Sequence, residues 1–136
     1  MIPRWLQRRQ SWLPLDQRGV AAIEYAIVLP VLLAFMFGIM ETGRVLWYKV
    51  SLQRATAVAT RCGAVSAPGC TTAAGVAAKA AASAPGIKLT ASVFTVNLAD
   101  TCGVRVSAAL PYTFSIRKLG TPSITLTAND CHPKTQ

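Results

Sequence analysis

The sequence predicts an α+β protein in which a long N-terminal transmembrane helix continues into a small domain with an antiparallel sheet of three to four strands. Three observations support this fold class. Residues 20–40 form a run of 21 residues with a single charge. Helix-forming residues then continue without proline to residue 64. After residue 86 the pattern changes from helical spacing to the strict alternation of strands.

The apolar run has the length of a membrane span. About 20 apolar residues, rising 1.5 Å each, cross a hydrocarbon core of roughly 30 Å. We therefore expect residues 20–40 to be the transmembrane half of the helix and residues 41–66 its outer half. Pro30 is expected to bend the span, because proline removes one helical hydrogen bond and crowds the preceding turn. Residues 1–19 form a basic leader, with four arginines against one aspartate.

Residues 67–136 are expected to form a small extracytoplasmic α+β domain. Thr71 or Thr72 is placed to cap a short alanine-rich helix over residues 73–82. Alternating residues predict strands at 88–98, 104–110 and 123–128. Such a meander has one apolar face that needs a cover, and the outer half of the long helix is the candidate.

All four cysteines, Cys62, Cys70, Cys102 and Cys131, follow the apolar run. An even number on one side of a membrane suits disulfides in an oxidising compartment. Zinc is the alternative, but there is no Cys-x-x-Cys pair and only His132 is available to assist. We predict Cys62–Cys70 and Cys102–Cys131, the two local pairings among three possible ones. The C-terminal domain is then periplasmic or extracellular, and the N-terminus is cytoplasmic.

The inventory of reactive side chains does not predict an enzyme, and no cofactor or metal is expected. Only one histidine and four acidic residues follow residue 19, without a phosphate-binding loop or a nucleophile elbow. The net charge of +9 is spread along the chain, with no basic run after the leader beyond Arg117–Lys118. Membrane lipid is therefore an expected partner, and nucleic acid is not favoured.

Glu24 is the charged residue within the apolar run. A carboxylate at the centre of a span costs about 2.5–3.5 kcal/mol, so such a residue is a functional candidate. Alternatively, Glu24 lies at the membrane interface and the span begins at Ala26. Cleavage after Gly19 would give Val20 a charged amine at i, i+4 from Glu24, on the same helix face. The two charges would then pair within one chain or between neighbouring chains.

Residues 18–26, Arg-Gly-Val-Ala-Ala-Ile-Glu-Tyr-Ala, followed by Val-Leu-Pro at residues 28–30, resemble the opening of the TadE-like minor pseudopilins. These proteins belong to tight-adherence (Flp-type) pilus machinery. The resemblance continues through residues 38–44 (Gly-Ile-Met-Glu-Thr-Gly-Arg) and 61–64, and more loosely through 104–114. Four cysteines and the Asn-Asp-Cys-His tail at residues 129–132 depart from the family pattern.

The resemblance implies a pilin-like fold and a minor pseudopilin-like role in a pilus assembly or secretion machine of the bacterial inner membrane. By position, a prepilin peptidase would cut between Gly19 and Val20. Glu24, Tyr25 and Pro30 would serve assembly. The implied partners are this peptidase, pilins or other pseudopilins, and inner-membrane components of pilus assembly.

Three other interpretations remain open at this point. A secretory signal peptide would also have a basic start and an apolar region, but no small-x-small cleavage site follows the run. An unprocessed single-pass anchor would hold an extracytoplasmic interaction domain. A pilin-like protein that binds DNA would use the positive charge after residue 19. The sequence does not distinguish a filament subunit from a tip or priming component or a part of the machine.

Overall fold

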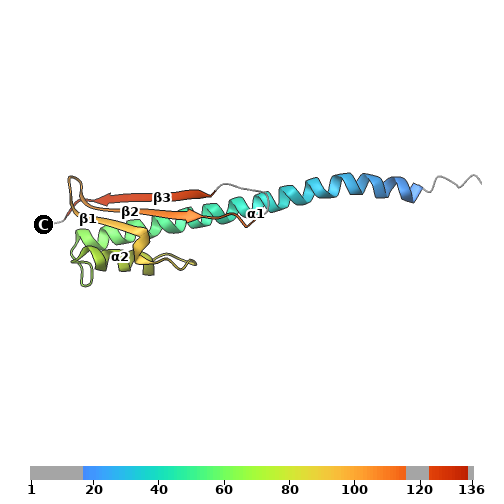
Figure 1. Ribbon diagram of the computed structural model, residues 1–136. Coiled ribbons are helices and arrows are strands. Elements are labelled where there is room, and N and C mark those ends of the chain that lie inside the picture. The colour runs from blue at the N-terminus through green and yellow to red at the C-terminus, as the bar shows by residue number, and fades with distance from the viewer. Residues whose placement is uncertain (1–16, 116–122, 135–136) are drawn as a thin grey trace, which may run out of the picture. The chain divides into compact units, whose positions relative to one another are not determined.

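The computed structural model describes residues 17–115 and 123–134. The predicted leader up to residue 16 therefore lies outside the described residues. The elements are helix α1 (Gln17–Ala64), helix α2 (Ala73–Ala82), the 3-10 turn η2 (Ala91–Val93), and strands β1 (Phe94–Asp100), β2 (Gly103–Tyr112) and β3 (Ile124–His132) (Figure 1). The α+β fold class is confirmed. The chain divides into two compact units, residues 1–38 and 39–136, and α1 contributes to both.

The three strands form one antiparallel sheet in the order β1-β2-β3. Alternate residues of each strand point to the interior, because neighbouring side chains of a strand lie on opposite faces. The tight turn between β1 and β2 depends on Gly103, which has a φ of 120°. A side chain there would collide with the backbone of His132 and Pro133, so only glycine fits.

Two predicted strand boundaries were wrong. The first strand begins at Phe94 rather than at residue 88, because residues 91–93 form a 3-10 turn in which the Val93 N–H donates to the Thr90 carbonyl. The hydroxyls of Thr90 and Ser92 also bond to each other at 2.8 Å, a local contact that competes with strand pairing. The third strand runs on to His132 instead of ending at residue 128, because residues 129–132 pair with β2.

The core of the second unit lies between the sheet and the two helices. Leu52, Ala55 and Ala59 recur at helical spacing on α1 and are completely buried. They share one cluster with Val76 of α2 and Val106 of β2. The outer part of α1 therefore covers the apolar face of the sheet, as predicted. Helix α2 occupies residues 73–82, and its N-cap is Thr72, whose hydroxyl accepts from the Gly75 N–H.

Polar side chains inside this core have hydrogen-bond partners. Ser51, Thr56 and Thr60 of α1 are buried. The Ser51 hydroxyl donates to the Pro85 carbonyl at 3.1 Å, and the Thr56 hydroxyl donates to the Gln53 carbonyl. Thr60 lies 2.5 Å from the Asp130 carboxylate of β3. A buried polar group without a partner costs about 1–3 kcal/mol. These hydrogen bonds therefore allow α1 to bury a face that carries both polar and apolar side chains.

Candidate assembly surface

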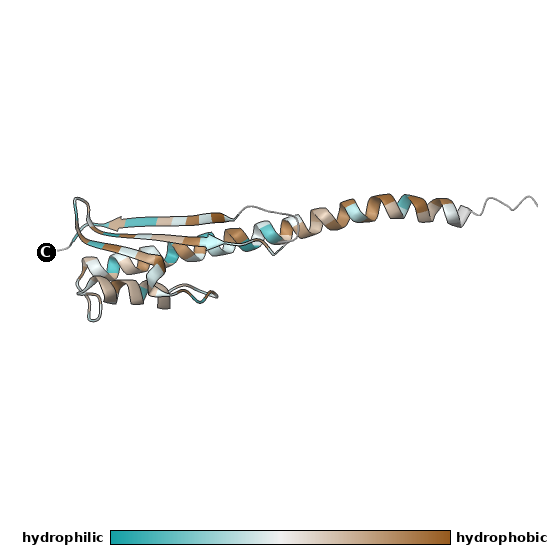
Figure 2. Cartoon of the chain, viewed as in Figure 1, coloured by the Kyte–Doolittle hydropathy of each residue, from teal (hydrophilic) through white to brown (hydrophobic). Residues whose placement is uncertain are grey.

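The described part of the first unit is a helix whose apolar side chains all face outward. Every residue from 19 to 38 is exposed. Hydrophobic residues predominate along this part of α1 in Figure 2. The large exposed side chains are Val20, Ile23, Tyr25, Ile27, Val28, Leu29, Val31, Leu32, Leu33, Phe35, Met36 and Phe37. A helix that is apolar on all sides needs lipid or other helices around it.

Among the described residues, α1 is the helix that is long and apolar enough to cross a membrane. Its apolar stretch lies near the N-terminus, and none of the residues in that stretch is buried within the structure. The chain therefore has one long apolar helix consistent with a single-pass membrane anchor. Pro30 is retained inside this helix. The bend predicted at Pro30 stays a prediction.

The residues predicted for processing and assembly lie along this exposed helix. Gly19 has open space around the position of a Cβ. Val20 is exposed, and Glu24 follows one helical turn later on the same face. Tyr25 is among the most exposed side chains of the unit, at 73%. Helical spacing alone relates these residues, and their roles in cleavage and assembly stay predictions.

A second acidic residue, Glu41, follows the apolar run and belongs to the second unit. Its Oε1 accepts a hydrogen bond from the Tyr112 hydroxyl at 2.8 Å and one from the Ser115 N–H at 3.2 Å. Its Oε2 lies 3.4 Å from Nη1 of Arg44, which follows three residues later on the same helix. Arg44 also donates to the Ser115 hydroxyl. Glu41 therefore joins the beginning of the outer helix to the end of β2.

The surroundings of Glu41 favour its charged form. The hydrogen bond from Tyr112 is the main reason that the pKa of the Glu41 carboxyl lies below its usual 4.5, and Ser115 and Arg44 add to the effect. Burial raises the pKa of Tyr112, and the bond to Glu41 raises it further. The Tyr112 ring is itself held by edge-to-face contacts with Tyr48 and Phe114, each with centroids 5.4 Å apart.

The sequence did not reveal the contact between Glu41 and Tyr112, since 71 residues separate them. Each residue lies in a segment that carries the resemblance, 38–44 and 104–114. The structure brings these two segments together. One signal pointed to Glu41, namely its position as the first charge after the apolar run, but nothing in the sequence identified its partner.

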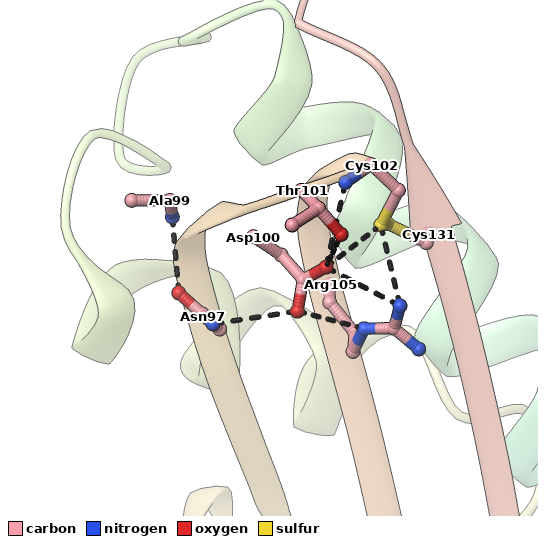
Figure 3. A network of polar contacts seen from close by, with 7 residues as sticks. All are labelled: Asn97, Ala99, Asp100, Thr101, Cys102, Arg105 and Cys131. Atoms are coloured by element: carbon pink, nitrogen blue, oxygen red, sulfur yellow. Dashed lines mark hydrogen bonds and ion pairs between the residues drawn. A yellow bond between two sulfur atoms is a disulfide. The ribbon is translucent and has the colours of Figure 1, made fainter.

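The far end of the sheet carries another polar network, around the turn between β1 and β2 (Figure 3). Arg105 Nε lies 2.9 Å from the Asp100 carboxylate, and this bond is the main reason that the pKa of Asp100 is lowered and that of Arg105 raised. The Asp100 carboxylate also accepts from the Cys102 N–H at 3.4 Å. The turn is thus held by its own side chains.

Both predicted cysteine pairings are present in the structure. Cys62, near the end of α1, is bonded to Cys70 ahead of α2, and Cys102 in the turn is bonded to Cys131 of β3. Asp100 lies beside the second disulfide, so that Asp100, Cys102 and Cys131 have the proximity of metal ligands. The two sulfurs are joined to each other and are not two thiolates, so this cluster does not have the donor set of a zinc site.

A long apolar N-terminal helix followed by a second helix and an antiparallel sheet is the layout of a pilin-like protein. Residues 19–61 match the model of the TadE-like protein family, which identifies this helical part of the chain as TadE-like and confirms the predicted resemblance. The matched residues include both Glu24 and Glu41 and end before α2 and the sheet. No curated protein and no solved structure matched the chain.

Proposed function

We propose that this protein is a minor pseudopilin-like component of a tight-adherence type pilus assembly or secretion machine. It is non-catalytic and joins the machine through its N-terminal helix. The observation that carries the proposal is the coincidence of the family match with a helix whose apolar side chains are all exposed. Pilins or other pseudopilins and inner-membrane assembly components are the partners that such a helix would meet within the membrane.

Processing between Gly19 and Val20 by a prepilin peptidase is part of this proposal. An unpaired carboxylate within a span costs about 2.5–3.5 kcal/mol. Cleavage would create an amine on Val20, one helical turn from Glu24, and would leave Glu24 near the positive end of the helix dipole. The same cut thus supplies two favourable interactions for the Glu24 side chain, the amine of its own or a neighbouring chain and the helix dipole.

The proposed location is the bacterial inner membrane, with the N-terminus in the cytoplasm and residues 67–136 in the periplasm or outside the cell. Four arginines precede the span and three basic residues closely follow it, so the positive-inside rule favours a cytoplasmic N-terminus by a small margin. Two disulfides in the second unit are typical of an oxidising compartment.

The mature N-terminal residue tests the proposal. Mass spectrometry of the protein purified from membranes should find Val20 as the first residue. Gly19→Leu should abolish cleavage and leave the longer chain in the membrane, because the bulky side chain occupies the cleavage position. Gly43→Leu is the matched control, since Gly43 is also a helical glycine with open space around its Cβ position.

Three results would contradict the proposal. Uncleaved wild-type protein would favour the unprocessed single-pass anchor, which has a different role. Cleavage near residues 39–44 would indicate a secretory signal peptide. Cleavage of Gly19→Leu at the normal position would show that the peptidase does not recognise Gly19.

A further inference from the structure

Helix α1 carries an exposed stripe on the face turned away from its buried residues. Its members are Trp47, Val50, Arg54, Val58, Arg61 and Val65. With 3.6 residues per turn, these six positions fall within about a quarter of the helix circumference. The buried residues Leu52, Ala55 and Ala59 belong to a different face. We call this set the arginine stripe.

The arginine stripe borders a groove of about 390 Å³. On the α1 side the groove is lined by Arg54, Ala57, Val58 and Arg61, and on the other side by Ser83 and Pro85, which follow α2. The hydrogen bond from Ser51 to the Pro85 carbonyl fixes this second wall against α1. The groove thus has an apolar centre at Val58, with the guanidinium groups of Arg54 and Arg61 on either side of it. These two arginines lie about two helical turns apart.

The two arginines of the stripe have no acidic partner within residues 17–115 and 123–134. Neither Arg54 nor Arg61 forms a salt bridge with a described residue, and the only two such pairs in the described ranges are Arg44–Glu41 and Arg105–Asp100. Residues 39–136 contain ten basic residues and three acidic ones. All three acidic side chains are engaged: Glu41 by Tyr112, Asp100 by Arg105 and Asp130 by Thr60.

This distribution of charge argues against a second copy as the occupant. Another copy would present mostly cations to Arg54 and Arg61, because basic residues outnumber acidic ones by ten to three in residues 39–136 and the three carboxylates already have partners. Like charges across an interface are repulsive and exclude the wrong partner. A complementary partner must bring carboxylates and an apolar surface together.

We infer that the arginine stripe is a docking surface for an acidic, amphipathic α-helix of a different protein. Arg54 and Arg61 are seven residues apart, which corresponds to about 10.5 Å along a helix. A partner helix with carboxylates at that spacing and an apolar residue between them matches both guanidinium groups and Val58. Arginine pairs well with carboxylates, because its planar fork can donate two parallel hydrogen bonds.

Photo-crosslinking in the native membrane tests this inference. A photo-reactive amino acid replaces Val58 in the full chain, and the cross-linked peptide is sequenced. The expected product joins position 58 to a helical segment of another protein that carries at least two carboxylates about 10 Å apart. Arg54→Glu combined with Arg61→Glu should reduce the yield about tenfold, which corresponds to about 1.4 kcal/mol. Replacing the two carboxylate residues of the partner with lysine should restore the yield in that double variant.

The matched control is Lys88→Glu combined with Lys134→Glu, which changes the net charge equally at two exposed lysines outside the groove. This control should keep the wild-type yield. Peptide mapping of both disulfides in each variant verifies folding. A cross-link only to a second copy, to lipid or to nucleic acid would overturn the inference, as would equal yields from the two double variants. The readout is a cross-link and not piliation, so this outcome is separate from that of the proposed function.

Discussion

Two glutamates on α1 have opposite surroundings. Glu41 accepts hydrogen bonds from Tyr112 and Ser115 and lies beside Arg44, so that its charge is compensated within the chain. Glu24 is exposed on an apolar helix. A charge in hydrocarbon requires a counter-charge or a route to water. Glu41 thus has a structural role in the fold, whereas the role proposed for Glu24 lies between molecules.

Glu24→Ala should separate insertion from assembly. Removing the carboxylate lowers the cost of the span, so the protein should still insert in the membrane. It should no longer co-purify with the machine, because the Val20 amine then has no carboxylate at residue 24 with which to pair. Glu24→Asp, which keeps the charge, should retain most of the association. If the alanine variant co-purifies normally and supports piliation or secretion, Glu24 is only an interfacial residue.

Tyr112→Phe should weaken the fold and reduce its sensitivity to acid. Folding lowers the pKa of Glu41, so the associated stability is present above pH 4.5 and is lost as the pH falls through the lowered value. Without the Tyr112 hydroxyl, the Glu41 pKa returns toward 4.5 and this part of the pH dependence shrinks. Thermal unfolding in detergent, measured between pH 7 and pH 3, would show both effects.

Tyr48→Phe is the control for that measurement. It removes a hydroxyl for which no hydrogen bond is seen in the described ranges, and it preserves the ring that contacts Tyr112. A Tyr112→Phe profile that coincides with the Tyr48→Phe profile would show that the bond to Glu41 contributes nothing measurable. Asp100, held by Arg105, retains its own acid sensitivity in both variants.

At the scale of elements, α2 is tied to the loop before it by a close backbone approach. A Cβ on Gly75 would overlap the Gly69 carbonyl oxygen. Cys70, next to Gly69, is bonded to Cys62 of α1. The loop is therefore held against α2 by the approach of Gly69 to Gly75 and against α1 by the disulfide. A shift of α2 relative to the loop would cost free energy.

Gly75→Ala should destabilise the protein although alanine is the better helix former. Alanine in a helix gains about 1 kcal/mol over glycine, whereas forced overpacking costs about 1–3 kcal/mol. Because the neighbour here is backbone, we expect the cost to exceed the gain. Gly43→Ala, with open space at its Cβ, should be neutral or stabilising. Denaturant unfolding of both variants gives the comparison, and a stabilised Gly75→Ala would refute the close approach.

At the scale of the whole molecule, the two disulfides stabilise the fold and require an oxidising compartment to form. The ring closed by Cys62–Cys70 is short, with a sequence separation of 8, and that closed by Cys102–Cys131 is longer, with a separation of 29. In the chain-entropy model, the rings stabilise the fold by about 2.6 and about 3.6 kcal/mol. Replacing the second pair with serines should therefore cost more stability than replacing the first.

Non-reducing peptide mapping of membrane-purified protein should find both bonds intact. Their presence would agree with a domain outside the cytoplasm, because cytosolic thiols are kept reduced. Free thiols throughout would place residues 67–136 in the cytoplasm and reverse the proposed orientation. A Cys62–Cys102 link would contradict the pairing while leaving the orientation unchanged.

Local patterns were sufficient to predict most elements of this protein. The apolar run, the helical spacing to residue 64 and the capping threonine are short-range signals, and they predicted α1, α2 and its cap. Alternation predicted three strands, but the ends of two were wrong. A strand ends where its residues no longer pair with the neighbouring strand. The alternation within one segment does not indicate where that pairing stops.

The sequence by itself determined the exposed apolar helix, the TadE-like resemblance and the positions of Gly19, Glu24 and the four cysteines. Only the tertiary structure decided that Glu41 meets Tyr112, that Asp130 meets Thr60, and that Arg54 and Arg61 have no acidic partner among the described residues. The physical reason is distance along the chain. Helical and strand periods arise between residues a few positions apart, whereas these contacts join residues about 70 positions apart and exist only after the sheet has packed on α1.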